Sequence, residues 1–409
     1  MISRLAGGVE SPYAWLRLCT AVAIGTIGGV GMWSIVVAMP AVQAEFGVAR
    51  ADAALPYTVA MIGFVIGTVL MGRLADRFGI VVPVAGAILL LVAGYAGTAF
   101  APDIVSFALL YGVLVGFGGS AMFAPLLADT SLWFDRRRGL AIGLCASGNY
   151  FAGMLWPPVV EHFIAEHGWR QTHIGIALFC LVTMLPLLLL MRRRPPLEPP
   201  PVMAAGEAAP VKAAPLGLPP NLLQGLLMLA GIGCCVAMSM PQVHIVAYCV
   251  DLGYGAARGA EMLSLMLGLG VVSRLASGWI LDRIGGLPTL LLGATMQGIA
   301  LAFYIPFDGL ASLYLISAMF GLVQGGIVPS YAFIVRELFP AREAGLRVSL
   351  AISATLAGMA FGGWLSGAIY DLTGSYQAAL VNGVAFNLMN VTIVSWLLYR
   401  RLRRQPAAA

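Results

Sequence analysis

The sequence predicts an all-α integral membrane protein with twelve transmembrane helices in two six-helix bundles. Of its 409 residues, 60% are hydrophobic and only 10% are charged, a balance that a soluble chain could not keep out of water. The apolar runs last about 20 residues each, the length of a helix that crosses the hydrocarbon core with its backbone hydrogen bonds satisfied internally. The 50 glycines are typical of membrane helices that pack closely through small residues.

One turn occurs twice in the chain. Gly72–Gly79 and Gly278–Gly285 share the pattern Gly-x-x-x-Asp-Arg-x-Gly at an offset of 206 residues (278 − 72), about half the chain. This repeat predicts related domains at 1–191 and 221–409, joined by a linker at 192–220. We expect each turn to form charge pairs at the inner membrane surface that break when the halves move; the alternative is that its arginines only hold a loop inside. The predicted gating residues are Gly72, Asp76, Arg77, Gly79, Gly278, Asp282, Arg283 and Gly285.

Six apolar segments precede the linker and six follow it. In the first half the predicted helices span roughly 14–38, 54–72, 80–100, 104–130, 139–162 and 172–191. In the second half they span roughly 221–249, 258–281, 288–306, 310–335, 346–370 and 378–399. The linker is rich in Pro and Ala, which predicts a flexible cytoplasmic connection between the two bundles.

The basic residues lie mostly on one side of the membrane. When the loops are assigned alternately, 19 of the 23 fall on one side, Arg50, Arg170 and Arg258 fall on the other, and Arg274 lies within a helix. This asymmetry is the positive-inside pattern, and it predicts a protein of the cell inner membrane with both termini in the cytoplasm. The net charge of +5 is scattered over many turns, so we expect no nucleic-acid partner.

The sequence contains no catalytic or metal-binding motif. The six cysteines all lie in apolar segments without metal-ligand spacing. There is no His-Glu-x-x-His pair, no phosphate-binding loop and no nucleophile elbow. We therefore expect a protein that is not an enzyme, with no cofactor and no metal site.

Arg274 is the strongest candidate for a substrate-binding residue. A charge at its depth in an apolar helix costs on the order of 2.5–3.5 kcal/mol on insertion scales, so it should face water or a partner. Gly270, Ser277 and Gly278 share its helix face and are expected to leave room for a ligand. A guanidinium suits a carboxylate because it can bind both oxygens at once. The alternative is an ion pair within the membrane, but the candidate acids all lie near helix ends: Asp129, Glu161, Glu261 and Asp371.

Several other residues are candidates for the lining of a central cavity. His244 lies well inside a helix, where it either contacts substrate and couples a proton, or is held by packing and a backbone carbonyl. The aromatic and polar candidates are Trp33, Tyr57, Phe123, Asn149, Tyr331 and Trp364. Phe123 and Tyr331 are the stronger pair, because they lie on equivalent helices and each is close to a proline that loosens its helix.

Together these features resemble the major facilitator superfamily over essentially the whole chain. Gly72-x-Leu-Ala-Asp76-Arg77-x-Gly79 is similar to that superfamily's signature loop between helices 2 and 3. Residues 278–285 are similar to its weaker counterpart between helices 8 and 9. The resemblance implies two six-helix bundles, a central cavity and alternating access by rocking of the halves.

Within the superfamily, the chain resembles the branch of monocarboxylate transporters and oxalate/formate antiporters. Trp133-Phe-x-x-Arg137-Arg138-Gly-x-Ala-x-Gly143-x-x-x-Ser147-Gly is similar to that branch's motif entering helix 5, and Arg274 falls where those families keep a substrate-binding arginine. Two features depart from the branch. Gly28-Gly29-Val-Gly31-Met-Trp33 lacks the acidic residue of the helix 1 motif, and Gly270 stands where an acid often precedes the arginine.

The expected function is secondary transport of a small organic anion, with a monocarboxylate such as lactate or pyruvate favoured. One central cation suits one carboxylate, and 348–370 contains no Lys, whereas the resemblance to oxalate/formate antiporters implies one there. Coupling is by proton symport or anion exchange. The alternatives are a dicarboxylate or other organic-anion antiporter of the same fold, and a drug or metabolite exporter. The expected partners are the substrate, a proton under symport and the lipid bilayer, and the chain is expected to be a monomer.

Overall fold

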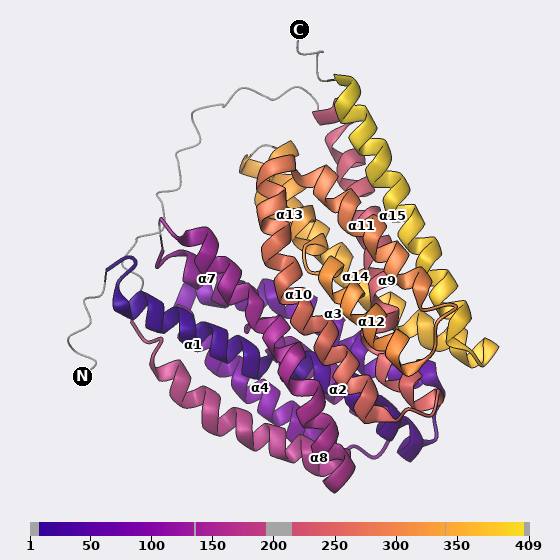
Figure 1. The fold of residues 1–409 in the computed structure, drawn as a ribbon. Helices are drawn as coiled ribbons and strands as arrows, with labels where there is room; N and C mark the ends of the chain where they lie inside the picture. The colour runs from indigo at the N-terminus through magenta and orange to yellow at the C-terminus, as the bar shows by residue number, and fades with distance from the viewer. Residues whose placement is uncertain (1–7, 135, 194–214, 340, 405–409) are drawn as a thin grey trace. The chain divides into compact units, whose positions relative to one another are not determined.

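The computed structural model describes residues 8–134, 136–193, 215–339 and 341–404, and it consists of helices joined by short turns (Figure 1). The side chains of 76, 138, 139, 215, 341–346 and 404 lie outside this description.

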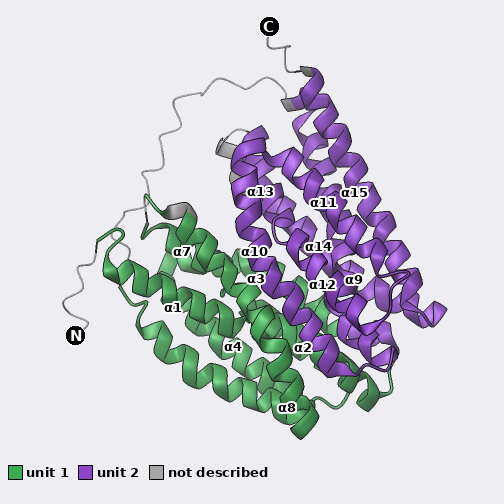
Figure 2. Ribbon diagram, viewed as in Figure 1, with its two compact units in different colours: residues 1–48, 55–207 green, residues 49–54, 208–409 purple. Residues whose placement is uncertain are grey.

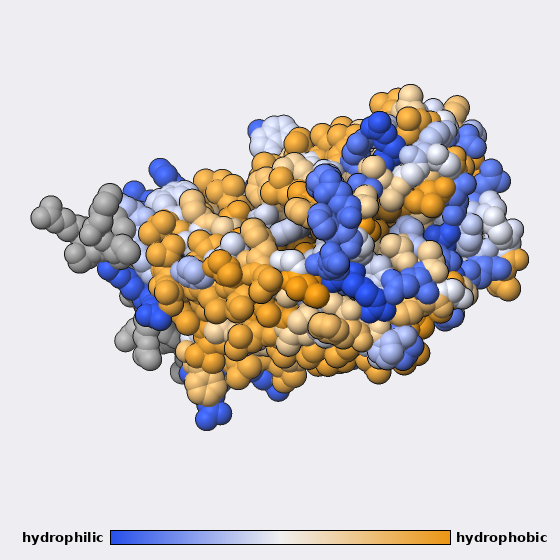
Figure 3. Space-filling model, turned by 90° about the horizontal axis from the view of Figure 1, so that it is seen from below, coloured by the Kyte–Doolittle hydropathy of each residue, from blue (hydrophilic) through white to orange (hydrophobic). Residues whose placement is uncertain are grey.

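The predicted all-α membrane fold is confirmed. Within the described part of the chain, eleven helical stretches are long and apolar enough to cross a membrane. One of them, Leu140–Leu189, holds two crossings, because Gly168 leaves the helical conformation with φ 80° and ψ 159°. The twelve predicted helices correspond to these stretches once the longest is divided at Gly168. Apolar side chains cover much of the face shown in Figure 3, as expected for a surface that meets lipid.

The chain groups into two compact units, which Figure 2 shows in different colours. Unit 1 contains residues 1–48 and 55–207, and unit 2 contains residues 49–54 and 208–409. The segment 49–54, at the start of a helix of the first half, therefore groups with the second half of the sequence. Residues 194–214 of the predicted linker lie outside the described residues.

The helices of unit 1 come first along the chain. They are α1 (Pro12–Gly28), α2 (Val30–Phe46), α3 (Arg50–Phe78), α4 (Val81–Ala99), α5 (Ile104–Leu109), the π-helix η2 (Leu110–Gly116), α6 (Phe117–Ser120), α7 (Ala124–Ser131) and α8 (Arg138–Leu189), where the first turn of α3 groups with unit 2. α1 and α2 form one crossing that is interrupted at Gly29. The outer loop after the first crossing is shorter than predicted, because α2 continues to Phe46 and α3 begins at Arg50.

Unit 2 contains the remaining helices. They are η3 (Pro215–Gly217), α9 (Pro220–Asp251), α10 (Ala256–Ile284), α11 (Gly286–Phe303), α12 (Leu310–Gln324), α13 (Ile327–Leu338), α14 (Ala341–Thr373) and α15 (Tyr376–Arg404).

A transmembrane helix is interrupted midway in each unit. In unit 1 the predicted helix 104–130 divides at Phe123, whose backbone leaves the helical region (φ −124°, ψ −85°) just before α7. In unit 2 the predicted helix 310–335 divides at Gly325 and Gly326, between α12 and α13. Backbone groups released at such breaks need new partners inside the protein.

Glycines bring the interrupted helices into backbone contact with their neighbours. A Cβ atom added to Gly116 would lie 2.4 Å from the carbonyl oxygen of Ala60, and one added to Gly321 would lie 2.3 Å from that of Met266. Ala60 and Met266 are themselves separated by 206 residues (266 − 60), the offset of the repeated turns. The two units therefore use the same small-residue packing between equivalent helices.

Replacing Gly321 by Ala should destabilise unit 2, because the added methyl group meets the backbone of α10 and cannot be accommodated by a side-chain movement. Overpacking of this kind costs about 1–3 kcal/mol. The melting temperature of the detergent-purified protein measures the effect. Gly278→Ala on α10 is the matched control and should melt like the wild type, since no atom lies within 4 Å of its added Cβ. Equal melting temperatures for both variants would contradict the close packing.

Candidate functional site

Arg274 lies on α10 of unit 2, beside the break between α12 and α13. Its side chain is half-buried, and its Nε–H donates to the carbonyl oxygen of Gly325 at 3.3 Å. Gly325 directly follows the last residue of α12, so the guanidinium lies at the carboxyl end of that helix. A cation there is favourable because it meets carbonyl groups that have no partner within the helix.

The small residues around Arg274 serve the packing of this break. A Cβ on Gly325 would lie 2.2 Å from the carbonyl oxygen of Gly270, and one on Gly326 would lie 2.0 Å from Ser277. Two of the three residues expected to leave room for a ligand therefore face the break instead. The third, Gly278, is exposed and has no atom within 4 Å of an added Cβ.

Two buried glutamines lie next to the break that Arg274 contacts. Gln324, the last residue of α12, accepts a hydrogen bond from the amide of Gln242 on α9 and donates to the carbonyl oxygen of Met266 on α10 at 3.4 Å. Gln324 is fully buried, and Gln242 is 4% exposed. These amides were not among the predicted site residues. A polar amide in the middle of an apolar helix was the available signal, since such groups must find partners inside the membrane.

His244 of α9 is satisfied on both sides of its ring. Its Nε2 lies 2.7 Å from the carbonyl oxygen of Gly363, which can only accept, so Nε2 carries the proton and Nδ1 accepts from the hydroxyl of Tyr376 at 3.0 Å. The side chain is fully buried. This geometry favours the alternative in which His244 is held by packing and a backbone carbonyl.

Arg50 organises a polar cluster within unit 2. Its Nη2 lies 2.9 and 3.0 Å from the two carboxylate oxygens of Asp251, and its guanidinium lies 4.8 Å from the ring centre of Tyr370. Asp371 accepts hydrogen bonds from the backbone N–H groups of Arg50 and Ala51, at 2.8 and 2.7 Å. A carboxylate at the amino end of α3 satisfies groups that have no partner within the helix. These contacts explain why 49–54 groups with unit 2.

The two aromatic candidates of unit 2 have different environments. Tyr331 of α13 is fully buried, and its hydroxyl donates to the side-chain oxygen of Asn390 on α15 at 3.0 Å. Trp364 of α14 is 37% exposed and lies beside Phe361. Tyr331 thus joins two helices of unit 2, whereas Trp364 presents its ring at a surface.

Of the four residues of unit 1 predicted to line a central cavity, the structure brings two into contact. The Nε1–H of Trp33 donates to the backbone carbonyl of Asn149 at 3.3 Å. Phe123 is half-buried at the helix break, and Tyr57 is 1% exposed. Trp33 is also buried, so Asn149 and Phe123 are the more accessible residues of this set.

Unit 1 also contains a buried ion pair that sequence reasoning missed. The guanidinium of Arg17 on α1 binds both carboxylate oxygens of Asp129 on α7, each at 2.8 Å, and also donates to the carbonyl oxygen of Met191 at 2.6 Å. The Arg17 and Asp129 side chains are only 2% and 6% exposed. The ring of Trp133 lies 4.8 Å from the guanidinium carbon. Arg17 was assigned to the cytoplasmic surface and Asp129 to a helix end, and their distance of 112 positions in sequence concealed the contact.

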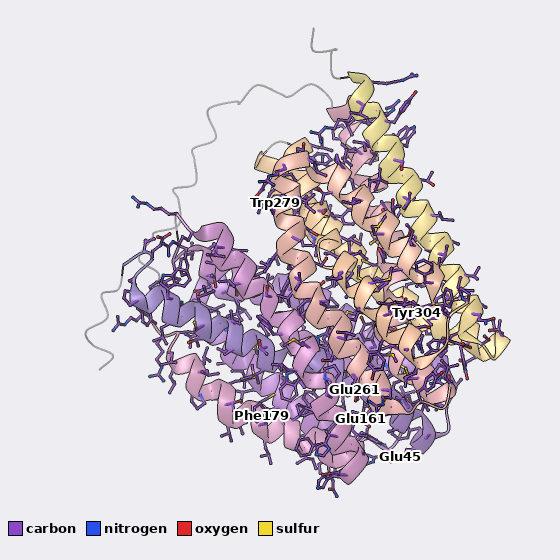
Figure 4. All side chains as sticks on the ribbon, viewed as in Figure 1. Glu45, Glu161, Phe179, Glu261, Trp279 and Tyr304 are labelled. Carbon is purple, nitrogen blue, oxygen red and sulfur yellow. The ribbon has the colours of Figure 1, made fainter. Side chains whose placement is uncertain are left out.

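The repeated turns end α3 and α10 in the same way. Gly79 has φ 79° and Gly285 has φ 85°, a region that residues with a side chain rarely adopt. The side chains of Arg77 and Arg283 are exposed and lie over the aromatic rings of neighbouring residues, such as Trp279, which is labelled in Figure 4.

The other predicted gating residues differ in their exposure. Gly72 is half-buried, with no atom within 4 Å of an added Cβ, and Asp282 is exposed. The side chain of Asp76 lies outside the described residues. Among the described residues, no group of three or more His, Cys, Asp or Glu could hold a metal ion.

Comparison with known proteins identifies relatives along most of the chain. The Major Facilitator Superfamily matches residues 21–316 and 282–409. Monocarboxylate transporter 13 of Rattus norvegicus is 28% identical over 339 residues, which cover 82% of this chain and 76% of that protein. Monocarboxylate transporter 11 of Homo sapiens is 28% identical over 403 residues, which cover 93% and 82%. The Agnestins efflux protein AgnL12 of Paecilomyces divaricatus is 23% identical over 330 residues, which cover 80% and 73%.

The fold is also found among solved structures. A bacterial homolog of the human lysosomal transporter Spinster, in an inward-facing and occupied conformation, matches with a TM-score of 0.72. The match covers 97% of this chain and 99% of that chain at 15% sequence identity, so the likeness concerns the fold alone.

Asp129→Ala should strongly destabilise unit 1, because Arg17 stays buried and loses the carboxylate that compensates its charge. Removing one partner of a buried ion pair costs about 3–5 kcal/mol. The double variant Arg17→Met/Asp129→Leu should recover much of the loss, since it leaves no buried charge. Thermal unfolding in detergent compares these proteins with Arg258→Gln, which breaks an exposed pair with Glu261 and should cost about 0.2–1 kcal/mol. If Asp129→Ala costs no more than this control, the buried ion pair contributes no more to folding than an exposed one.

Proposed function

Since this chain belongs to the Major Facilitator Superfamily, we propose that it is a secondary active transporter of a small organic anion, with a monocarboxylate of the lactate or pyruvate type as its substrate. The chain is a multi-pass membrane transporter and not an enzyme. We place it in the cell inner membrane with both termini in the cytoplasm. Most of its basic residues fall on one side when the loops are assigned alternately, and the positive-inside rule makes that side cytoplasmic. In this proposal it works as a monomer, by alternating access of its two halves.

The observation that carries the proposal is the position of Arg274. It is a charged residue in a membrane-crossing helix, only half-buried, beside a helix that is broken midway. Ionisable residues within membrane segments generally mark substrate or ion pathways, and broken helices are a common element of transporter binding sites. A guanidinium there would recognise a carboxylate through two parallel hydrogen bonds.

Two further observations support a monocarboxylate as the substrate. Two of the relatives are named monocarboxylate transporters. A dicarboxylate, the main alternative, would favour a second fixed cation, and α14 contains no Lys between Val348 and Tyr370. Transport assays with both substrate classes compare the two candidates directly.

Arg274→Ala should abolish uptake of labelled lactate or pyruvate into proteoliposomes, or raise KM about 10- to 100-fold. This range corresponds to losing hydrogen bonds to a charged group, worth about 1.5–3 kcal/mol. Arg274→Lys should retain part of the uptake, because it keeps the charge without the planar fork. The matched control is Arg258→Gln on the same helix, an exposed residue whose replacement should leave uptake unchanged. Full uptake by Arg274→Ala would refute the proposed anion site, and faster uptake of a dicarboxylate by the wild type would favour the alternative substrate.

The form of coupling can be measured in the same vesicles. Proton symport predicts uptake that increases as the external pH is lowered and that needs no internal anion. Anion exchange predicts uptake that depends on a carboxylate loaded inside and is insensitive to a proton uncoupler. Because both nitrogens of His244 already have partners, His244→Gln should preserve whichever behaviour the wild type shows. A His244→Gln transporter that binds substrate normally but loses its pH response would instead make His244 the proton-coupling residue.

A further inference from the structure

The last turns of α15 present four long side chains on one helix face. Trp396, Tyr399, Arg400 and Arg403 follow the spacing i, i+3, i+4 and i+7, and together they line a hollow of about 320 Å³. Leu397, on another face of the helix, is fully buried. The hollow therefore lies on the outward face of α15.

Each arginine of the hollow lies over an aromatic ring. The guanidinium carbon of Arg400 is 4.6 Å from the ring centre of Trp396, and that of Arg403 is 4.7 Å from the ring centre of Tyr399. The two aromatic residues remain 41% and 50% exposed. These cation–π contacts orient both guanidinium groups above an apolar floor.

The hollow lies at the depth of the lipid headgroups. Tyr376 begins α15, and the 20 residues from there to Trp396 rise about 30 Å, the thickness of the hydrocarbon core. Trp and Tyr are enriched at this boundary, and arginines extend beyond it toward the headgroups. The loop charges place this end of α15 in the cytoplasm, where the leaflet carries anionic lipid.

The hydrogen bonding of the arginines differs along this helix end. Arg401 is turned toward α13, where its Nη2 lies 2.6 Å from the carboxylate of Glu337. For Arg400 the described part of the chain provides no ion pair, and its Nη1, like that of Arg401, is buried without a hydrogen bond to the described residues. A buried donor without an acceptor is costly, so an acceptor from outside the chain would stabilise it.

We propose that this hollow is a binding site for the phosphate group of an anionic phospholipid of the cytoplasmic leaflet. Arg400 and Arg403 would bind the phosphate oxygens, and the rings of Trp396 and Tyr399 would contact the glycerol and upper acyl chains. A phospholipid would contact both the arginines and the aromatic rings of the hollow, whereas a free phosphate ion would contact only the arginines. The site is separate from Arg274 and does not depend on which anion is transported.

The test counts the lipids retained by the purified full-length protein. The wild type in nanodiscs of phosphatidylcholine with phosphatidylglycerol should carry phosphatidylglycerol into native mass spectrometry in preference to phosphatidylcholine. Arg400→Gln/Arg403→Gln should reduce this retention about tenfold, the effect of losing about 1.4 kcal/mol of binding free energy. The variant Arg400→Lys/Arg403→Lys should retain part of it, because it keeps the charge without the fork.

The matched control removes two exposed arginines elsewhere on the cytoplasmic side. Arg192→Gln/Arg336→Gln changes the net charge equally and should retain phosphatidylglycerol like the wild type. Melting temperatures in phosphatidylcholine alone check that every variant is folded. The proposal would be overturned if Arg400→Gln/Arg403→Gln retained as much phosphatidylglycerol as the wild type. It would also be overturned if the control variant lost as much phosphatidylglycerol as Arg400→Gln/Arg403→Gln. Stabilisation by inorganic phosphate as large as that by phosphatidylglycerol would assign the hollow to a free anion instead of a lipid.

Discussion

Buried guanidinium groups must find acceptors inside the membrane, and much of this structure follows from that requirement. A guanidinium that is shielded from water loses its solvation, so each buried arginine needs partners from neighbouring helices. Arg17 binds Asp129 and the end of α8 in unit 1. In unit 2, Arg50 binds Asp251, and Arg274 binds the carbonyl of Gly325. Arg17 and Arg50 are matched by carboxylates that lie 112 and 201 positions away in the sequence.

The two halves share their packing but not their chemistry. Both contain a helix that is broken midway and a glycine pressed against a neighbouring backbone, and the contacted residues Ala60 and Met266 lie one repeat apart. At the offset of the repeat, Thr68 of unit 1 corresponds to Arg274 of the second half (274 − 206). The duplicated unit thus supplies the framework, and a charged residue present in only one copy distinguishes the second half.

Local sequence patterns predicted the fold well because membrane helices are determined by length and composition. The all-α fold, the positions of its helices and the family followed from apolar runs and from a turn that requires glycine at its end. The contacts of individual polar residues did not follow. Arg17 resembled any other interfacial arginine until Asp129 was found beside it, 112 positions away in the chain. The partners of His244 come from α14 and α15, so its ring appeared available in the sequence although both nitrogens are satisfied. Contacts between distant helices depend on packing, which a single sequence does not display.

The position of Arg274 also connects ligand recognition with helix geometry. Its Nε–H donates to the carbonyl oxygen of Gly325 at the carboxyl end of α12, and α13 begins at Ile327. A carboxylate that binds the same guanidinium competes with the Gly325 carbonyl for it, so under the proposed function substrate binding changes the stability of the break. A ligand can shift a conformational equilibrium only by interacting differently with its two states. Under the proposed function, Arg274 would contact both the substrate and the break, and it would provide such a difference.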